Sequence, residues 1–374
     1  MPLDKTIQQM LGAMKGLGAS DLHLKAGMPP FYRVGGHLRS ASRPPITGEE
    51  IDELMTPVIP KTRRQFFEDH GDLDFSTEIG EGERFRVNIF RAGTKMNAAI
   101  RRVNSEIPTY DVLHLPPVYS QLIDKSREGL IIVSGVTGSG KSTTLAAMLE
   151  HINETRRENI VTIEDPIEYL FRPVKSIVSQ REIGIDIATY ADGLKYVVRQ
   201  DPDVIFIGEM RDKFTMTAAL QAAETGHLVF GSLHTADAMQ AFSRILEFFP
   251  RVEHEFIRGS LSNALRAICA QRLLPGCQEN SPLVPATEVL LNTPTCRELI
   301  RKEQDQDIPS LIASSEKEGM HSFTTSLAKL VEAELVFRDT AMQHAPNPDG
   351  LASVLRGITS QGQTLVHRVR GTGK

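Results

Sequence analysis

The stretch Gly135–Ser142, with the sequence GVTGSGKS, constrains the fold of this chain more than any other feature. It fits the pattern G-x-x-x-x-G-K-[ST], lies at the end of the apolar run GLIIVSGV, and precedes the helical run TTLAAMLEHI. Glycines let a backbone wrap closely around phosphate groups, and the free amides at a helix N-terminus attract negative charge. The motif therefore predicts a strand, a phosphate-binding turn and a helix in succession.

The same motif predicts which residues hold a nucleotide. We expect Lys141 to bridge the β- and γ-phosphates of ATP, and Ser142 to ligate Mg²⁺. The residues expected to contact the nucleotide are Gly135, Thr137, Gly138, Ser139, Gly140, Lys141, Ser142 and Thr143. A glycine-rich turn without a ligand is the alternative, and the flanking strand and helix argue against it.

Three carboxylates surround the proline that follows the strand-like run NIVTIED: Glu164, Asp165 and Glu168. Nucleotide sites of open α/β sheets lie beyond the carboxyl ends of the parallel strands. We therefore expect these side chains to point toward the phosphates, where one of them orients the attacking water. A solvated strand end is the alternative.

Two further strands carry candidate catalytic residues. PDVIFIGEMRD ends at Glu209 and resembles a Walker B element, with Gly208 where an aspartate is usual. Glu209 is expected to hold Mg²⁺ through water, and an ordinary strand with a charged end is the alternative. GHLVFGSLHT places His227 and His234 at the two ends of one strand. Each is a candidate for sensing the γ-phosphate by hydrogen bonding, with a structural role as the alternative.

Periodicity and proline content divide the chain, whose overall class is α/β. The hydrophobic periodicity of residues 1–103 predicts a small α+β domain with a mostly antiparallel sheet. The proline-rich segment 104–117 is the expected linker. Residues 118–345 predict a parallel sheet covered by helices, with a helical pattern after about residue 255. Residues 346–374 are the expected tail, which ends in the basic run HRVRGTGK.

The first domain carries an arginine-rich surface. Successive side chains of the expected strand RFRVNIFR point to opposite faces. One face is apolar, with Phe85, Val87 and Ile89, and the other is polar, with Arg84, Arg86 and Asn88. Arg101 and Arg102 follow on the next strand. This surface is either solvated or reaches the phosphates of a neighbouring site.

Charge and cysteine content exclude several classes of partner. A net charge of −5 and a pI of about 6.2 argue against binding to nucleic acid, which favours a basic surface. The three cysteines lack CxxC spacing, so neither a zinc site nor a disulfide framework is expected, which fits a reducing cytoplasm. The longest apolar run is too short to span a bilayer, so no direct membrane insertion is expected.

Five motifs in a fixed order resemble those of the secretion ATPases: ASDLHL, GVTGSGKST, IEDPIEY, RQDPDVIFIGEMRD and AAETGHLVFGSLHT. The chain is most similar to the PilT/PilU family of type IV pilus retraction ATPases, from about residue 3 to residue 345. The resemblance implies a PAS-like α+β N-terminal domain followed by a RecA-like P-loop ATPase domain with a helical C-terminal part. It places the catalytic glutamate at Glu168, the Walker B glutamate at Glu209, and the histidine box at His227 and His234. Glycine at 208 is common in that family.

The resemblance also implies an assembly and partners. The assembly would be a homo-hexameric ring with ATP between domains and between subunits, where Arg86 and Arg101 contact ATP. The partners would be an inner-membrane pilus platform protein and a paralogous pilus ATPase. The protein would then be cytoplasmic and peripheral at the inner membrane through these partners.

Some motifs bear on the direction of the motor. The sequence has neither the extra N-terminal domain nor the four-cysteine zinc insertion usual in assembly and type II secretion ATPases, which favours retraction. EVLLNTP and LIRKE resemble PilU, whereas RQDPDVIFIGEMRD resembles PilT. TCRELIRKE departs from the A-I-R-N-L-I-R-E run of PilT proteins, so a sole motor and an accessory motor are both compatible with the sequence.

Two other functions are alternatives. A P-loop motor that tracks along nucleic acid is opposed by the acidic net charge and by the lack of an aromatic and basic stripe. An adaptor of another pilus motor, gated by ATP but rarely hydrolysing it, is opposed by the complete set of Lys141, Glu168 and Glu209.

Overall fold

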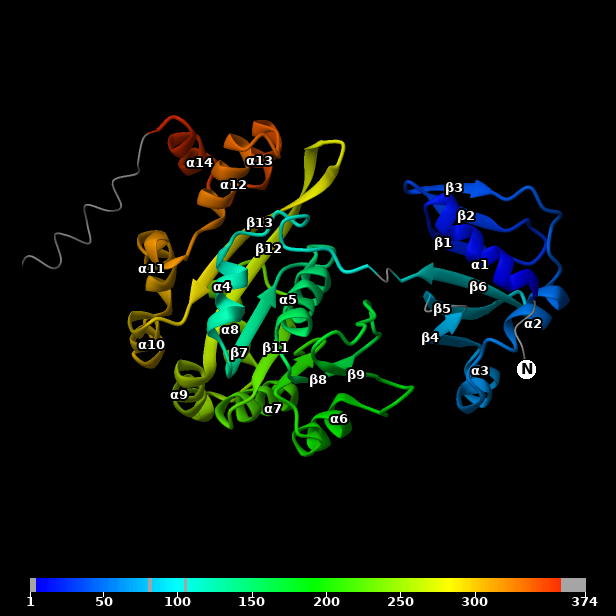
Figure 1. Ribbon diagram of the computed structural model, residues 1–374, viewed down its shortest axis with the longest axis horizontal. Coiled ribbons are helices and arrows are strands. Elements are labelled where there is room, and N and C mark those ends of the chain that lie inside the picture. Colours follow the sequence, from blue (N-terminus) through cyan, green and yellow to red (C-terminus); the bar gives the residue numbers. More distant parts are fainter. Residues whose placement is uncertain (1–4, 80–82, 104–105, 358–374) are drawn as a thin grey trace, which may run out of the picture. The chain divides into compact units, whose positions relative to one another are not determined.

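The computed structural model describes residues 5–79, 83–103 and 106–357. These residues form two compact units, each with its own sheet (Figure 1). The first unit contains the residues up to 107 together with the short segments 166–172 and 182–187, and the second contains the rest. Residues 104–105 of the expected linker and 358–374 of the expected tail, including HRVRGTGK, lie outside the described residues.

The first unit is built on a six-stranded sheet with the order β3-β2-β1-β6-β5-β4, in which every neighbouring pair is antiparallel. Its strands are β1 (Ala19–Leu24), β2 (Phe31–Val34), β3 (His37–Ser40), β4 (Asp72–Ile79), β5 (Glu83–Ala92) and β6 (Lys95–Arg102). Its helices are α1 (Lys5–Leu17), α2 (Gly48–Met55) and α3 (Arg64–His70). The antiparallel α+β fold predicted from the sequence is confirmed.

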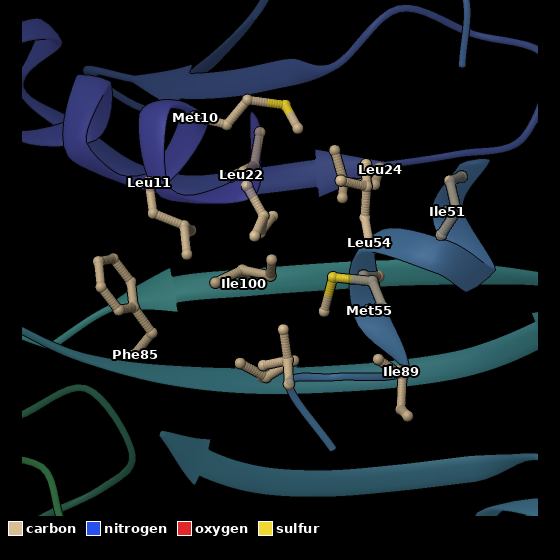
Figure 2. Packing of buried hydrophobic residues seen from close by; sticks show 14 of the residues in the cluster. Met10, Leu11, Leu22, Leu24, Ile51, Leu54, Met55, Phe85, Ile89 and Ile100 are labelled. Atoms are coloured by element: carbon tan, nitrogen blue, oxygen red, sulfur yellow. The ribbon is translucent and has the colours of Figure 1, made fainter. Parts of the chain in front are cut away.

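Apolar side chains of α1 and α2 pack against one face of this sheet (Figure 2). Met10 and Leu11 of α1 and Ile51 of α2 are buried there, as their helical spacing predicts. Thr47 and Glu50 form the predicted capping box at the start of α2. With one face buried in this way, alternate side chains of β5 point to the other face, which carries the arginines.

The second unit is built on a seven-stranded sheet with the order β13-β12-β7-β11-β10-β8-β9. Its strands are β7 (Gly129–Ser134), β8 (Asn159–Glu164), β9 (Ile177–Glu182), β10 (Val204–Ile207), β11 (Leu228–Leu233), β12 (Leu265–Gln278) and β13 (Ser281–Leu291). The five strands from β12 to β8 in this order are parallel, and β13 is antiparallel to β12. All residues of β7, β10 and β11 are buried, which is typical of a sheet covered on both faces.

Helices surround this sheet and form the end of the described chain (Figure 1). They are α4 (Val118–Lys125), α5 (Lys141–Thr155), α6 (Tyr190–Val197), α7 (Lys213–Glu224), α8 (Ala238–Glu247), α9 (His254–Ala264), α10 (Pro294–Arg301), α11 (Ile308–Ser314), α12 (Phe323–Glu332), α13 (Arg338–His344) and α14 (Pro348–Leu355). Helix α14 falls within the expected tail, which is therefore helical at its start. Among the described helices, none combines the length and the apolar character that a bilayer span requires.

One prediction for this unit is wrong. The sequence predicts only helices after about residue 255, but β12 and β13 form a long hairpin there (Figure 1). The leucine, alanine, arginine and glutamine residues of β12 favour a helix locally. The first half of β12 instead pairs in parallel with β7, for example Ile268 with Ile132, so tertiary pairing overrides the local preference. After Pro294 the predicted helices are confirmed, and α12 packs Phe323 and Leu327 onto the hairpin.

Candidate functional site

The predicted phosphate-binding turn joins β7 to α5 and has the backbone that this role requires. Gly138 and Gly140 have φ angles of 78° and 86°, in the left-handed region that glycine adopts at no steric cost. Gly135 is required by space, because a Cβ there would overlap Ser139 Oγ and lie 2.6 Å from the carbonyl oxygen of Gln271. Helix α5 begins at Lys141, so its N-terminus, which favours anions such as phosphate, follows directly on the turn.

The ammonium group of Lys141 lies against this turn. Its Nζ donates hydrogen bonds to the carbonyl oxygens of Gly135 at 2.8 Å and Val136 at 3.2 Å. The Lys141 side chain is buried. A lysine is rarely buried unless its ammonium group has polar partners, and these two carbonyl oxygens are such partners. Lys141 Nζ is therefore held against the turn that the motif predicts to bind the β- and γ-phosphates.

Gln271 of β12 anchors the turn, a role that the sequence did not reveal. Its Nε2 donates to the carbonyl oxygen of Ser139 at 2.5 Å, and its Oε1 accepts from Thr144 Oγ1 at 2.9 Å. The side chain is 1% exposed. One amide group thus ties the turn and the first turn of α5 to the neighbouring strand.

Three adjacent parallel strands bring candidate residues to one edge of the sheet. The phosphate-binding turn follows β7, His234 follows β11, and Glu209 follows β10. Glu209 Oε2 lies 2.7 Å from Arg211 Nη2, and Glu209 Oε1 lies 3.4 Å from His234 Nε2. The structure thus brings Glu209 and His234 together, and adds Arg211, to which the sequence analysis gave no role.

The three carboxylates after β8 differ in their surroundings. Glu164 is buried, and its Oε1 accepts hydrogen bonds from Thr162 Oγ1 at 2.6 Å and Gln180 Nε2 at 3.1 Å. These bonds engage the carboxylate with its neighbours, and its orientation toward phosphates stays a prediction. Asp165 is exposed. Glu168 is also exposed and belongs to the segment 166–172 of the first unit, and its catalytic role stays a prediction.

His227 lies at the opposite edge of the sheet. Strand β11 runs parallel to β7, and the carbonyl oxygen of His227 accepts from the amide of Gly129, the first residue of β7, at 2.9 Å. Its Nδ1 donates to the carbonyl oxygen of Ala222 near the end of α7 at 2.9 Å. The length of the strand separates it from the turn, which corrects the expectation that His227 lies beside the phosphate site of its own chain.

Arg86 and Arg101 lie opposite each other on β5 and β6 of the first unit. Both are exposed. Arg101 Nε donates to Asp21 Oδ1 at 2.8 Å, and Arg86 Nε lies 3.9 Å from Asp74 Oδ1. Although burial opposes it, hydrogen bonds from Ser20 and Arg101 lower the pKa of Asp21 below its ordinary value. The two arginines form one exposed cationic position, and their contact with ATP stays a prediction.

The oxygen donors at the sheet edge fit magnesium. Ser142 in the first turn of α5 offers a hydroxyl group, and Glu209 offers a carboxylate. Mg²⁺ typically takes one or two protein oxygens and completes its shell with substrate phosphates and water. Within the described part of the chain, no group of three or more His, Cys, Asp or Glu side chains is suited to hold a metal by itself. The Ser142 hydroxyl and the Glu209 carboxylate are the oxygen donors that a Mg²⁺ bound to nucleotide phosphates would take.

A parallel sheet with a phosphate-binding turn, a buried lysine and an acidic strand end places the second unit among the P-loop ATPases. The profile of the family described as type II/IV secretion system protein matches residues 1–329. The chain belongs to this family and, within it, to the PilT/PilU group of type IV pilus retraction ATPases.

Two named relatives are similar in sequence to this chain over nearly its whole length. The type IV pilus retraction ATPase PilT of Pseudomonas aeruginosa is 39% identical over 343 residues, which cover 92% of this chain and 99% of the relative. The type IV pilus ATPase PilU of the same organism is 37% identical over 350 residues, covering 93% and 91%. A crystal structure of the pilus retraction motor PilT with bound ADP matches with a TM-score of 0.86 and 42% identity, covering 92% of this chain and 98% of that one.

Proposed function

We propose that this protein is an ATP-hydrolysing motor that powers type IV pilus retraction and hence twitching motility. One observation carries the proposal: the Lys141 turn and the Glu209 carboxylate lie at one edge of one parallel sheet. Relatives named as pilus retraction ATPases over nearly the full chain support the same function.

The site residues suggest how ATP is bound and hydrolysed. The amides of the turn and Lys141 hold the β- and γ-phosphates, and the nucleotide is also held by Thr143. Ser142 and Glu209 would hold Mg²⁺, which when bound neutralises phosphate charge. Glu168 orients the attacking water. His234, beside Glu209, donates a hydrogen bond when the γ-phosphate is present and so senses it.

A ring assembly would convert hydrolysis into force. We infer a homo-hexamer in which Arg86 and Arg101 of one subunit contact ATP held by another. ATP binding then favours a closed arrangement of the two units, and hydrolysis releases it. Work is done only because the nucleotide binds the two arrangements with different affinities.

The partners follow from the same proposal. The ring would act in the cytoplasm on an inner-membrane pilus platform protein and would reach the membrane through that protein. Because relatives named PilT and PilU match this chain at similar identity, we also propose a paralogous ATPase as a functional partner.

Deletion of the gene in its host tests the function. We expect excess surface pili with no twitching, restored by the wild-type gene but not by Lys141→Ala. Loss of pili on deletion would instead indicate an assembly motor. Purified wild-type protein should hydrolyse ATP well above Glu168→Gln, and equal, negligible rates for the two would contradict a motor function.

A further inference from the structure

The residue that follows β10, at position 208, has little space for a side chain. Gly208 stands where a P-loop ATPase commonly carries the Walker B aspartate. Its φ is not positive, so its backbone would accept any residue. A Cβ at this position would lie 3.0 Å from Tyr190 Oη, and 3.3 Å from both Glu164 Cα and the carbonyl oxygen of Ile163. Glycine is therefore favoured here by the closeness of its neighbours, the Tyr190 hydroxyl first, and not by backbone conformation.

The backbone at Gly208 is held on both sides. Its amide donates to the carbonyl oxygen of Ile163 at 2.8 Å, and its carbonyl oxygen accepts from Ser232 Oγ at 2.6 Å. These two hydrogen bonds join it to the strands on either side, β8 and β11. A larger residue at 208 would have to displace the Tyr190 side chain, because the backbone itself has little freedom to move.

Tyr190 is fixed by the helix that it begins. It is the first residue of α6, whose N-cap Thr189 accepts a hydrogen bond from the amide of Asp192 at 3.1 Å. Leu194 and Val197 bury the other face of α6. The position of Tyr190 is thus set by the start and the buried face of α6, and its hydroxyl lies beside Gly208 at the carboxyl end of β10.

The surroundings of the Tyr190 hydroxyl are acidic. Burial first, and then Asp165, Glu209 and Glu164, raise the pKa of Tyr190 well above its ordinary value, while Arg211 opposes them. The hydroxyl therefore keeps its proton and is available as a hydrogen-bond donor among carboxylates. An aspartate in the same place would instead add another negative charge.

We propose that Tyr190 is a positioning residue of the ATPase site. Its hydroxyl lies 3.0 Å from where a Cβ at 208 would stand, in the space that an aspartate side chain would need, and its proton faces an acidic surrounding that includes Glu209. In place of the hydrogen-bond acceptor that an aspartate at 208 would supply, the site has a donor, the Tyr190 hydroxyl. Glu209 is then the carboxylate at the end of β10 that would face Mg²⁺. This inference rests on the proposed ATPase function.

Tyr190→Phe removes the hydroxyl and keeps the ring. We expect kcat for ATP to fall about tenfold with little change in KM, because the lost hydroxyl positions Glu209 and does not bind ATP. The Mg²⁺ concentration that gives half the maximal rate should rise severalfold. Tyr196→Phe, on the exposed part of the same helix, is the matched control and should behave as wild type. A purely structural tyrosine would change the thermal unfolding midpoint and leave the Mg²⁺ dependence unchanged.

Gly208→Asp, alone and combined with Tyr190→Ala, tests whether the Tyr190 side chain fills the space that an aspartate at 208 would need. Alone, the aspartate should lower both soluble yield and turnover, because Tyr190 fills its place. With Tyr190→Ala, yield and turnover should recover to at least about tenfold above Gly208→Asp alone, a coupling that independent sites do not show.

Two results would overturn the inference: Tyr190→Phe with wild-type kcat and Mg²⁺ dependence, or losses in the double variant that simply add. If the wild-type protein itself does not hydrolyse ATP, the proposed function fails instead, so the two failures are distinguishable.

Discussion

Single residues far apart in the chain hold the phosphate-binding turn in shape, and Gln271 shows this most directly. Gln271→Leu would leave the carbonyl oxygen of Ser139 and the hydroxyl of Thr144 without this partner. We expect a loss of about 1–3 kcal/mol in the free energy of unfolding, since buried polar groups would be unpaired. ATP turnover should fall by about tenfold or more as the turn loses its anchor.

Calorimetry and a phosphate-release assay measure these two effects. Gln221→Leu is the matched control, because Gln221 is an exposed glutamine of α7. A Gln271→Leu variant that turns over ATP at the wild-type rate would show that the turn keeps its shape without the strand.

The residues of the turn could be predicted because their spacing in the sequence is itself the functional pattern. Gln271, by contrast, lies 132 residues beyond Ser139, and no local pattern marks it as a partner of the turn. Tyr190 escaped prediction for the same reason, since its place beside Gly208 depends on which elements become neighbours. Arg211, only two residues from Glu209, was overlooked within the motif itself. The Thr162 and Gln180 bonds that hold Glu164 could likewise not be predicted from the sequence.

At the scale of elements, the strands with continuous apolar runs could be predicted, and the hairpin β12–β13 could not. Strands β7, β8, β10 and β11 are short buried runs bounded by turns, which leaves few alternatives. Strand β12 mixes polar and apolar residues without strict alternation, so its pairing with β7 decides its structure. Strand order, and with it the separation of His227 from the turn, likewise depends on long-range pairing.

The junction between β13 and α12 is expected to make stability depend on pH. His321 is buried and shares a hydrogen bond with Thr287 Oγ1 at 2.7 Å. Burial is the main cause that lowers the pKa of His321 to about 4. An unfolded histidine takes up a proton near pH 6.5, so between about 6.5 and 4 the unfolded state binds the extra proton. Stability should therefore be full above this window and fall as the pH falls through it, by roughly 1 kcal/mol per pH unit from this residue.

Thermal unfolding at pH 7 and pH 5 measures this effect. The midpoint of the wild type should fall more between the two values than that of His321→Gln, which cannot titrate. His37→Gln, at an exposed position of β3, should fall as the wild type does. Equal slopes for the wild type and His321→Gln would contradict a neutral buried histidine.

Helix α9 is tied to the segment after α10 by an ion pair between the buried Arg258 and the partly buried Asp305. Arg258 Nη1 and Nη2 donate to the two carboxylate oxygens of Asp305 at 2.7 and 2.6 Å, and Nη1 also donates to the carbonyl oxygen of Ile300. We expect Arg258→Ala to cost about 3–5 kcal/mol of unfolding free energy, because Asp305 loses its partner in a partly buried place.

Chemical denaturation of the purified protein measures this loss. Arg244→Ala, which breaks the exposed pair with Glu247, is the control and should cost under about 1 kcal/mol. If the two variants were equally stable, the Arg258 pair would not hold α9 to the later helices.

At the scale of the whole molecule, the two units carry complementary parts of the proposed chemistry. The phosphate-binding turn belongs to the second unit, and Arg86 and Arg101 belong to the first. If the arginines complete the site of a neighbouring subunit, a subunit that lacks only Lys141 can still supply its arginines to the next one. The two defects should then complement each other in a mixed ring.

Mixing Lys141→Ala with Arg101→Ala in equal amounts, under conditions in which subunits exchange, tests this directly. Each variant alone should be nearly inactive, because every site of its ring lacks one part. In random mixed rings about a quarter of the sites combine an intact turn with an intact arginine from the neighbour, so about a quarter of the wild-type ATP turnover should return. Lys141→Ala mixed with the double variant lacking both residues should stay inactive. An absence of recovery would place the arginine in the site of its own chain, and full activity of Arg101→Ala alone would make the arginine-rich face a solvated surface.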